Sequence, residues 1–82
     1  MTTTPTREAS PARIVLTAEG GIVTATVTAD DGRTAEFTTR DGGRLIQNLD
    51  RRLAQHGILR NAYDVEPVAG QRVLVADGWW LP

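Results

Sequence analysis

The sequence predicts an α+β domain built from an antiparallel β-meander, one amphipathic helix packed on one face of the sheet, and a C-terminal β-hairpin. Three observations predict this order, β-β-β-α-β-β. Apolar and polar residues alternate from 13 to 39, two glycine-containing turn signals divide that stretch, and leucine and isoleucine recur at helical spacing from 44 to 56.

Chain length and composition predict a single folded unit. A chain of 82 residues has room for one domain, and such a domain buries only roughly 60% of its unfolded surface. Hydrophobic residues make up 40% and charged residues 23%, values typical of globular proteins. Residues 1–12 contain little that could be buried and are interpreted as a flexible N-terminal tail, so residues 13–82 form the predicted domain.

The turn formed by Asp30, Asp31 and Gly32 determines how the second and third strands pair. Apolar residues occupy odd positions in both strands, as Val27 and Phe37 do, and polar residues take the even positions. Because paired residues in a hairpin point to the same face, the loop must contain an odd number of residues. This turn supplies three, with glycine at the position that needs a left-handed backbone.

The turn at Gly20 and Gly21 joins the first strand to the same face. Apolar residues of the first strand occupy even positions, as Ile14 and Leu16 do. Pairing with the odd positions of the second strand therefore requires an even number of loop residues. Two glycines form the loop that primed turns favour. Both turns therefore predict one apolar sheet face, made of Ile14, Leu16, Val23, Ala25, Val27, Ala35 and Phe37.

Residues 44–56 predict the helix that covers this apolar face. Its apolar residues fall within a stripe about 100° wide on the helix surface; they are Leu45, Ile46, Leu49 and Leu53. Asp41 is interpreted as the N-terminal cap. Gly57 followed by Ile58 is typical of a left-handed C-cap with its hydrophobic contact.

The last third of the chain predicts a second hairpin. Residues 63–66 alternate and indicate a strand, 67–71 indicate a turn, and 72–76 form an apolar run rich in valine. Asp77 and Gly78 are interpreted as a further turn that leads into residues 79–82.

The side-chain inventory argues against catalysis. The chain has no cysteine, no lysine, one histidine and one serine, Ser10, which lies in the expected tail. A cysteine nucleophile and a Schiff-base lysine are therefore excluded. Asp30 and Asp31 are explained by their turn, and His56 by the end of the helix. We expect no enzyme, no cofactor and no metal site.

The sequence gives no sign of membrane or general nucleic-acid attachment. No apolar run of about 20 residues exists, and the N-terminus lacks a basic region followed by an apolar one. The formal net charge is −1, which gives no general attraction to polyanions. We expect a cytoplasmic protein.

The adjacent tryptophans near the C-terminus predict a contact surface. Neighbouring residues on a strand point to opposite faces, so Trp79 and Trp80 cannot both pack on one side of the sheet. One of them, with Leu81, would form an exposed anchor. The first hypothesis is therefore a non-catalytic protein-interaction module, an adaptor, regulator or inhibitor, with a homodimer as one option, which uses this anchor and the open threonine-rich sheet face.

A nucleic-acid-binding domain is the alternative, and a small-molecule enzyme is the remote one. Binding would use Arg40, Arg44 and Arg51, of which the last two share the outer helix face. The predicted topology resembles the sheet-plus-helix domains with which some tyrosine recombinases bind DNA, and also small antitoxin-like proteins. The outer sheet face of those DNA-binding domains carries basic and aromatic residues, whereas here it carries threonines and Glu36, so no family is assigned.

Overall fold

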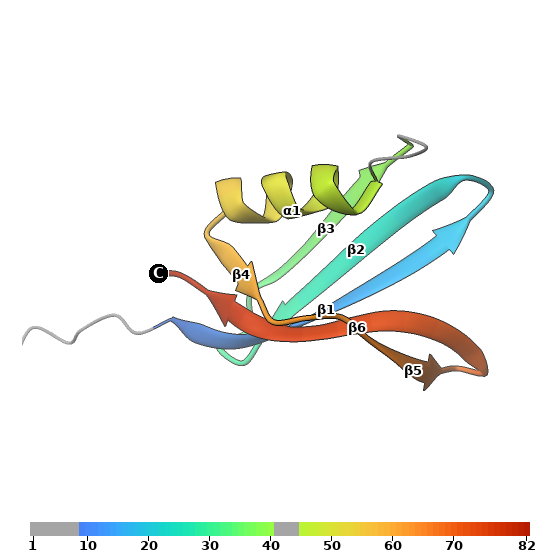
Figure 1. The fold of residues 1–82 in the computed structure, drawn as a ribbon. Coiled ribbons are helices and arrows are strands. Elements are labelled where there is room, and N and C mark those ends of the chain that lie inside the picture. The colour runs from blue at the N-terminus through green and yellow to red at the C-terminus, as the bar shows by residue number, and fades with distance from the viewer. Residues whose placement is uncertain (1–8, 41–44) are drawn as a thin grey trace, which may run out of the picture.

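The computed structural model describes residues 9–40 and 45–82 and shows a curved antiparallel sheet with one helix on one face (Figure 1). The elements are β1 (Ser10–Glu19), β2 (Ile22–Ala29), β3 (Thr34–Thr39), α1 (Leu45–Gln55), β4 (Ile58–Arg60), β5 (Asp64–Val68) and β6 (Gln71–Trp80). The predicted α+β class, the meander and the following helix are confirmed.

The two longest strands, β1 and β6, form the centre of the sheet. The strand order is β3-β2-β1-β6-β4, and β5 also pairs with β6. Every pairing is antiparallel. The helix lies over β3 and β4 on one face, which we call the helix face, and the opposite side is called the open face (Figure 1).

Both predicted turns of the meander are confirmed. Ala25 pairs with Leu16 on one side and with Phe37 on the other, so the odd and even sets meet as the loop lengths require. Gly20 and Gly21 have φ angles of 58° and 77°, and Gly32 has 94°. These positive values are the left-handed conformations for which glycine is favoured.

The core lies between the helix face and α1, as predicted. Phe37 is 5% exposed, and Leu49 and Leu53 of the helix are 0% and 1% exposed. The buried cluster consists of Ala12, Ile14, Leu16, Ala25, Val27, Ala29, Phe37, Leu49, Leu53, Ile58 and Ala76. Asp41, Arg44 and the side chains of Leu45 and Ile46 lie outside the described residues.

The helix ends in the predicted left-handed cap. Gly57 has a φ of 76°, its N–H donates to the Ala54 carbonyl at 3.0 Å, and Ile58 is buried. The Leu81 N–H donates to the Gly57 carbonyl at 2.8 Å, which joins the helix end to the chain after β6.

Two turn predictions in the last third of the chain are wrong. Asp77 and Gly78 do not turn the chain, because they continue β6 and pair with Arg13 and Ala12 of β1. The hairpin itself is confirmed, but its turn is shorter than residues 67–71. Val68 already pairs with Gln71, so Ala69 and Gly70 form the turn with φ angles of 51° and 80°.

The sheet also begins earlier and contains one more strand than expected. β1 starts at Ser10 rather than near Arg13, and Ala12 is 6% exposed within the core. Residues 1–8 lie outside the described residues. The additional strand, β4, follows the helix directly and pairs with residues 78–80 of β6.

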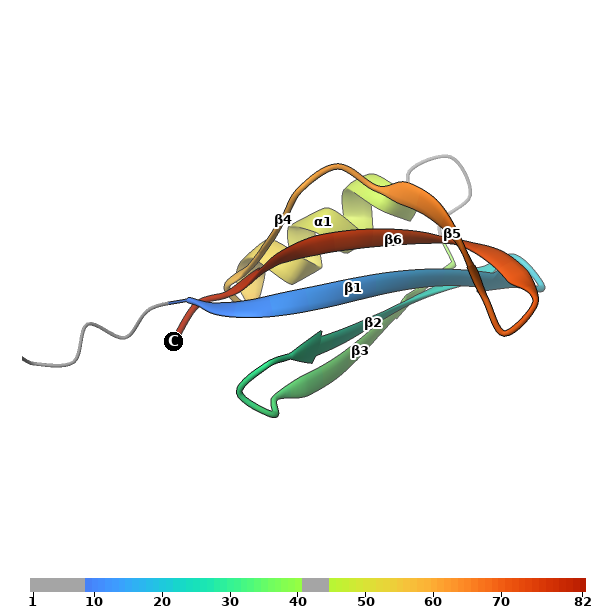
Figure 2. The same ribbon diagram turned by 90° about the horizontal axis from the view of Figure 1, so that it is seen from below.

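The β5–β6 hairpin twists across the open face. β5 crosses β6 on the side away from the helix (Figures 1 and 2), and Arg13 of β1 forms an ion pair with Glu66 of β5 at 3.0 Å. Val73 and Val75 point to the open face, yet they are 7% and 2% exposed. The hairpin therefore covers one end of the open face and leaves the other end uncovered.

Candidate interaction surface on the open sheet face

Trp80 belongs to the helix face and takes part in the fold. It pairs with Ile58, packs against the buried cluster, and donates its indole N–H to the His56 carbonyl at 3.1 Å. The Arg33 guanidinium lies 4.7 Å from its ring centroid, within the range of a cation–π contact. Of the predicted anchor residues, Trp80 is thus the one used by the core.

Arg33, which follows the turn between β2 and β3, fixes the end of β6. Its guanidinium donates to the Trp80 carbonyl at 3.1 Å and to the Leu81 carbonyl at 2.8 Å. Asp31 orients the same guanidinium by accepting from its Nε at 2.8 Å. Because of these contacts, the strand that carries Trp79 is held firmly at its C-terminal end.

Trp79 stands in an exposed apolar row on the open face. Register places it opposite Pro11 of β1 on one side and opposite Leu59 of β4 on the other. Trp79 is 43% exposed, Leu59 is 49% exposed, and Pro11 is also exposed. Three neighbouring strands thus present apolar side chains side by side, and we call Pro11, Leu59 and Trp79 the apolar row.

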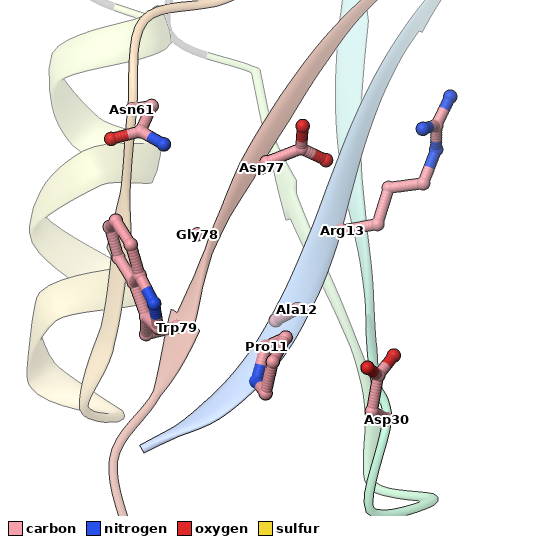
Figure 3. Close-up of a pocket in the computed structure, with 8 residues that line it drawn as sticks. All are labelled: Pro11, Ala12, Arg13, Asp30, Asn61, Asp77, Gly78 and Trp79. Carbon is pink, nitrogen blue, oxygen red and sulfur yellow. The ribbon is translucent and has the colours of Figure 1, made fainter. Parts of the chain in front are cut away.

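A shallow hollow of about 400 Å³ lies beside this row. Figure 3 shows Trp79 and Asn61 on one side of the hollow, Asp30 on the other, and Asp77 between β6 and β1. Its lining residues are Pro11, Ala12, Arg13, Asp30, Asn61, Asp77, Gly78 and Trp79. The hollow therefore combines an indole ring with two carboxylates.

The open face carries more negative than positive charge. Arg13 is already paired with Glu66 and extends away from Asp30 in Figure 3. Within the described residues, the carboxylates of Asp30 and Asp77 have no hydrogen bond or ion pair. Register also directs three further carboxylates to this face, those of Glu19, Glu36 and Asp64.

Gly78 allows β4 to approach β6 and so completes the apolar row. A Cβ atom at this position would overlap the Leu59 carbonyl oxygen and would lie 2.9 Å from the Arg60 Cα. Any side chain here would push β4 away and displace Leu59 with it. A glycine inside a strand indicates such a close backbone approach, which is the signal that could have revealed β4.

Most of the remaining open face is polar and exposed. Threonines from β1, β2 and β3 lie there together with Glu36; they are Thr17, Thr24, Thr26, Thr28, Thr34 and Thr38. The threonine-rich outer face is thus present as predicted. Leu81, the third anchor residue, is 42% exposed and lies next to Gly57, where an added Cβ would be 3.3 Å from the Leu81 Cβ.

The structure does not gather the predicted nucleic-acid-binding arginines into one described patch. Arg51 is exposed on α1 and Arg40 is exposed after β3, while Arg44 lies outside the described residues. Two other arginines near the helix are engaged internally. Arg52 donates to the Thr38 carbonyl and lies 5.6 Å from the Phe37 ring, and Arg60 pairs with Asp50 at 2.6 Å.

Arg60 also covers Tyr63, whose hydroxyl is buried. Its guanidinium lies 4.0 Å from the Tyr63 ring centroid, and burial raises the pKa of Tyr63. No partner for this hydroxyl is found among the described residues.

We expect Tyr63→Phe to leave the free energy of unfolding unchanged or to raise it by up to about 1 kcal/mol, since a desolvated donor is removed. Urea denaturation checks this, and a loss above about 1 kcal/mol would show that the hydroxyl has a partner.

Asp31 predicts a pH dependence of stability. The Arg33 backbone N–H donates to its carboxylate at 3.0 Å, and this bond, aided by the Arg33 guanidinium, lowers the pKa of Asp31. A lowered pKa means stabilisation that is present above the unfolded-state pKa and lost as pH falls through the folded-state pKa. Asp31→Asn should therefore be less stable than the parent at pH 7, and the difference should shrink below about pH 4 in thermal melts. A difference that stays constant down to about pH 2 would contradict this assignment.

The single histidine of the chain contacts the end of the helix and Phe37. His56 is exposed, its Nδ1 lies 2.9 Å from the Arg52 carbonyl oxygen, and its ring contacts Phe37 edge-on at 4.7 Å. It does not line the hollow. Within residues 9–40 and 45–82, no three metal-binding side chains come together. In the same part of the chain, no helix has the length and apolar character needed to cross a membrane.

Comparison with known proteins gives no relative to guide the interpretation of this surface. The sequence matches no protein-family model, and neither the curated proteins nor the solved structures show a significant similarity to it.

Proposed function

We propose that this chain is a non-catalytic protein-interaction module, an adaptor, regulator or inhibitor in the cytoplasm, that binds through the uncovered end of its open sheet face. The apolar row supplies the contact. Trp79 is its centre, since tryptophan contributes more binding energy than most residues when an interface covers it.

The exposure of Trp79 on a fixed strand is the observation that supports this proposal. Its neighbour Trp80 is tied to the core and to Arg33, so the exposed indole belongs to an ordered part of the sheet. Pro11 and Leu59 flank it on both sides. A prepositioned aromatic anchor loses little side-chain freedom on binding, which favours affinity.

The test replaces the two largest side chains of the apolar row by threonine, the residue already common on this face. Trp79→Thr combined with Leu59→Thr should lower the affinity for a natural partner at least about tenfold, because the anchor is lost. Since both side chains are about half exposed, the fold should remain. Affinity capture from native cell extract and the solution mass of the pure protein are the two readouts.

Val68→Thr is the matched control. Val68 is an exposed valine, at 39%, on the distant β5–β6 hairpin. Proteins retained by the parent and by this control, but lost from the double variant, would support the proposal. A homodimer that dissociates only in the double variant would support the self-associating form. Identical capture and identical mass for all three proteins would refute it.

Nucleic-acid binding remains a second proposal with narrower support. The observation in its favour is Arg51, which is exposed on the outer surface of α1. We expect short DNA or RNA to be shifted in a low-salt gel, and the shift to disappear as salt is raised. Arg51→Ala should weaken this binding. A gel without any shift would end it.

A further inference from the structure

We infer that the hollow beside Trp79 accepts an arginine or lysine side chain from a basic segment of the partner protein. This inference rests on the proposed function and specifies the chemistry of the partner. The composition of the hollow, the charge of the open face and the fixed position of the indole ring support it.

Trp79 supplies the face on which a cation can rest. A guanidinium or ammonium group placed over an indole is attracted by the negative potential of its ring. The protein uses the same contact internally, where Arg33 lies over Trp80 at 4.7 Å. The second indole, on the opposite side of the sheet, is 43% exposed and lines the hollow.

Asp30 and Asp77 supply the compensating charge. Both line the hollow, and within the described residues neither carboxylate is hydrogen-bonded or ion-paired. Among the residues that the structure describes, Arg13 is the one arginine that lines the hollow, and it forms an ion pair with Glu66 at 3.0 Å. Two carboxylates in a hollow that an aromatic ring also lines therefore favour a positive group, and a planar guanidinium can satisfy a carboxylate while it stacks.

The wider surface favours the same occupant. Glu19, Glu36 and Asp64 also face the open side, so a basic segment is attracted along the whole sheet. An acidic protein or a nucleic acid would be repelled by this face. The apolar row beside the hollow can hold the aliphatic stem of the inserted side chain, because such stems pack on apolar surface while the charged head pairs.

The experiment titrates the intact protein with a short peptide of alternating glycine and arginine. Binding is monitored through the two tryptophan indole N–H signals in nitrogen-15 correlated NMR spectra. We expect a saturable shift of the Trp79 signal. Trp80, whose N–H is bonded to the His56 carbonyl, is the internal reference. Matched peptides with glutamate or leucine in place of arginine should give no saturable shift.

Variants identify the groups responsible. Asp77→Asn and Asp30→Asn should each weaken arginine-peptide binding about threefold, and raised salt should weaken it further. Trp79→Leu, which keeps apolar bulk but removes the ring, should weaken it by a similar factor, measured by calorimetric titration because this variant has no Trp79 signal. Glu36→Gln removes an exposed carboxylate from the same face outside the hollow and should weaken binding less than Asp77→Asn or Asp30→Asn does.

The outcomes separate this inference from the proposed function. No Trp79 shift with the arginine peptide, or an equal shift with the leucine peptide, overturns the cationic occupant, while capture that depends on the apolar row would still support an interaction module. A Trp79 signal that moves with protein concentration alone identifies a second copy as the occupant and also overturns the inference. An arginine-specific shift lost in Asp77→Asn supports it.

Discussion

Gly78→Ala is expected to lower the free energy of unfolding by about 3 kcal/mol, the upper part of the range for overpacking. The added Cβ would overlap the Leu59 carbonyl oxygen, and a backbone atom cannot move aside as a flexible side chain can. The strand β4 must therefore separate from β6. Urea denaturation followed by circular dichroism measures the loss.

Gly21→Ala is the control for this substitution. A Cβ at Gly21 meets nothing within 4 Å, so its cost is limited to the strain of a residue at φ 77°, about 1 kcal/mol. The amide signals of Leu59 and Arg60 should lose hydrogen-exchange protection in the Gly78 variant only. Equal stability losses in the two variants would show that β4 does not approach β6 as closely as described.

Leu49→Ala is expected to cost about 3 kcal/mol, within the range for a leucine removed from a well-packed core. Leu49 is 0% exposed and lies in the cluster that joins α1 to the helix face. Small domains have total stabilities of roughly 5 to 15 kcal/mol, so this loss is a large fraction of the whole. Chemical denaturation of the variant provides the measurement.

Gln47→Ala, on the exposed side of the same helix, is the matched control. Its stability should differ from that of the parent by less than about 0.5 kcal/mol, since exposed helix positions tolerate alanine. Similar behaviour of the two variants would mean that the helix packs through another side, and the assignment of the two sheet faces would then be wrong.

The side chains that face the helix could be predicted from the sequence, because successive side chains of a strand point to opposite faces of the sheet. Once the two loop lengths were known, Ala25 had to meet Phe37 and Leu16 had to meet Ala25, and the structure confirms both pairs. A slip by one residue would have exposed every apolar side chain of that strand. The odd or even positions of the apolar residues are therefore a strong signal of strand pairing wherever glycine marks the turn.

The strand segments that the sequence does not predict are those where a local signal competes with strand pairing or where the strand is very short. Asp77 followed by Gly78 is a common turn sequence, but the ladders with β1 and β4 keep β6 extended there. β4 has only three residues, which is too short to show alternation. The composition of residues 1–12 predicts a tail that includes Pro11, yet proline is tolerated near the start of a strand.

Because these strands were not predicted, part of the candidate surface could not be predicted either. The apolar row needs Pro11 from the early part of β1 and Leu59 from β4, and neither position could be predicted without those strands. Trp79 could be predicted as one of two candidates because alternation requires adjacent tryptophans to face opposite sides. The registers with β1 and β4 show which tryptophan remains on the open face.

Collisional quenching of each tryptophan alone tests the central claim most directly. Trp80→Phe leaves Trp79 as the sole emitter, and Trp79→Phe leaves Trp80. Relative to N-acetyltryptophanamide at low ionic strength, Trp79 should be quenched more readily by caesium than by iodide, because its surroundings are exposed and acidic, and Trp80 should resist both ions. Equal quenching of the two tryptophans, or a preference of Trp79 for iodide, would contradict an exposed, negatively charged contact surface around Trp79.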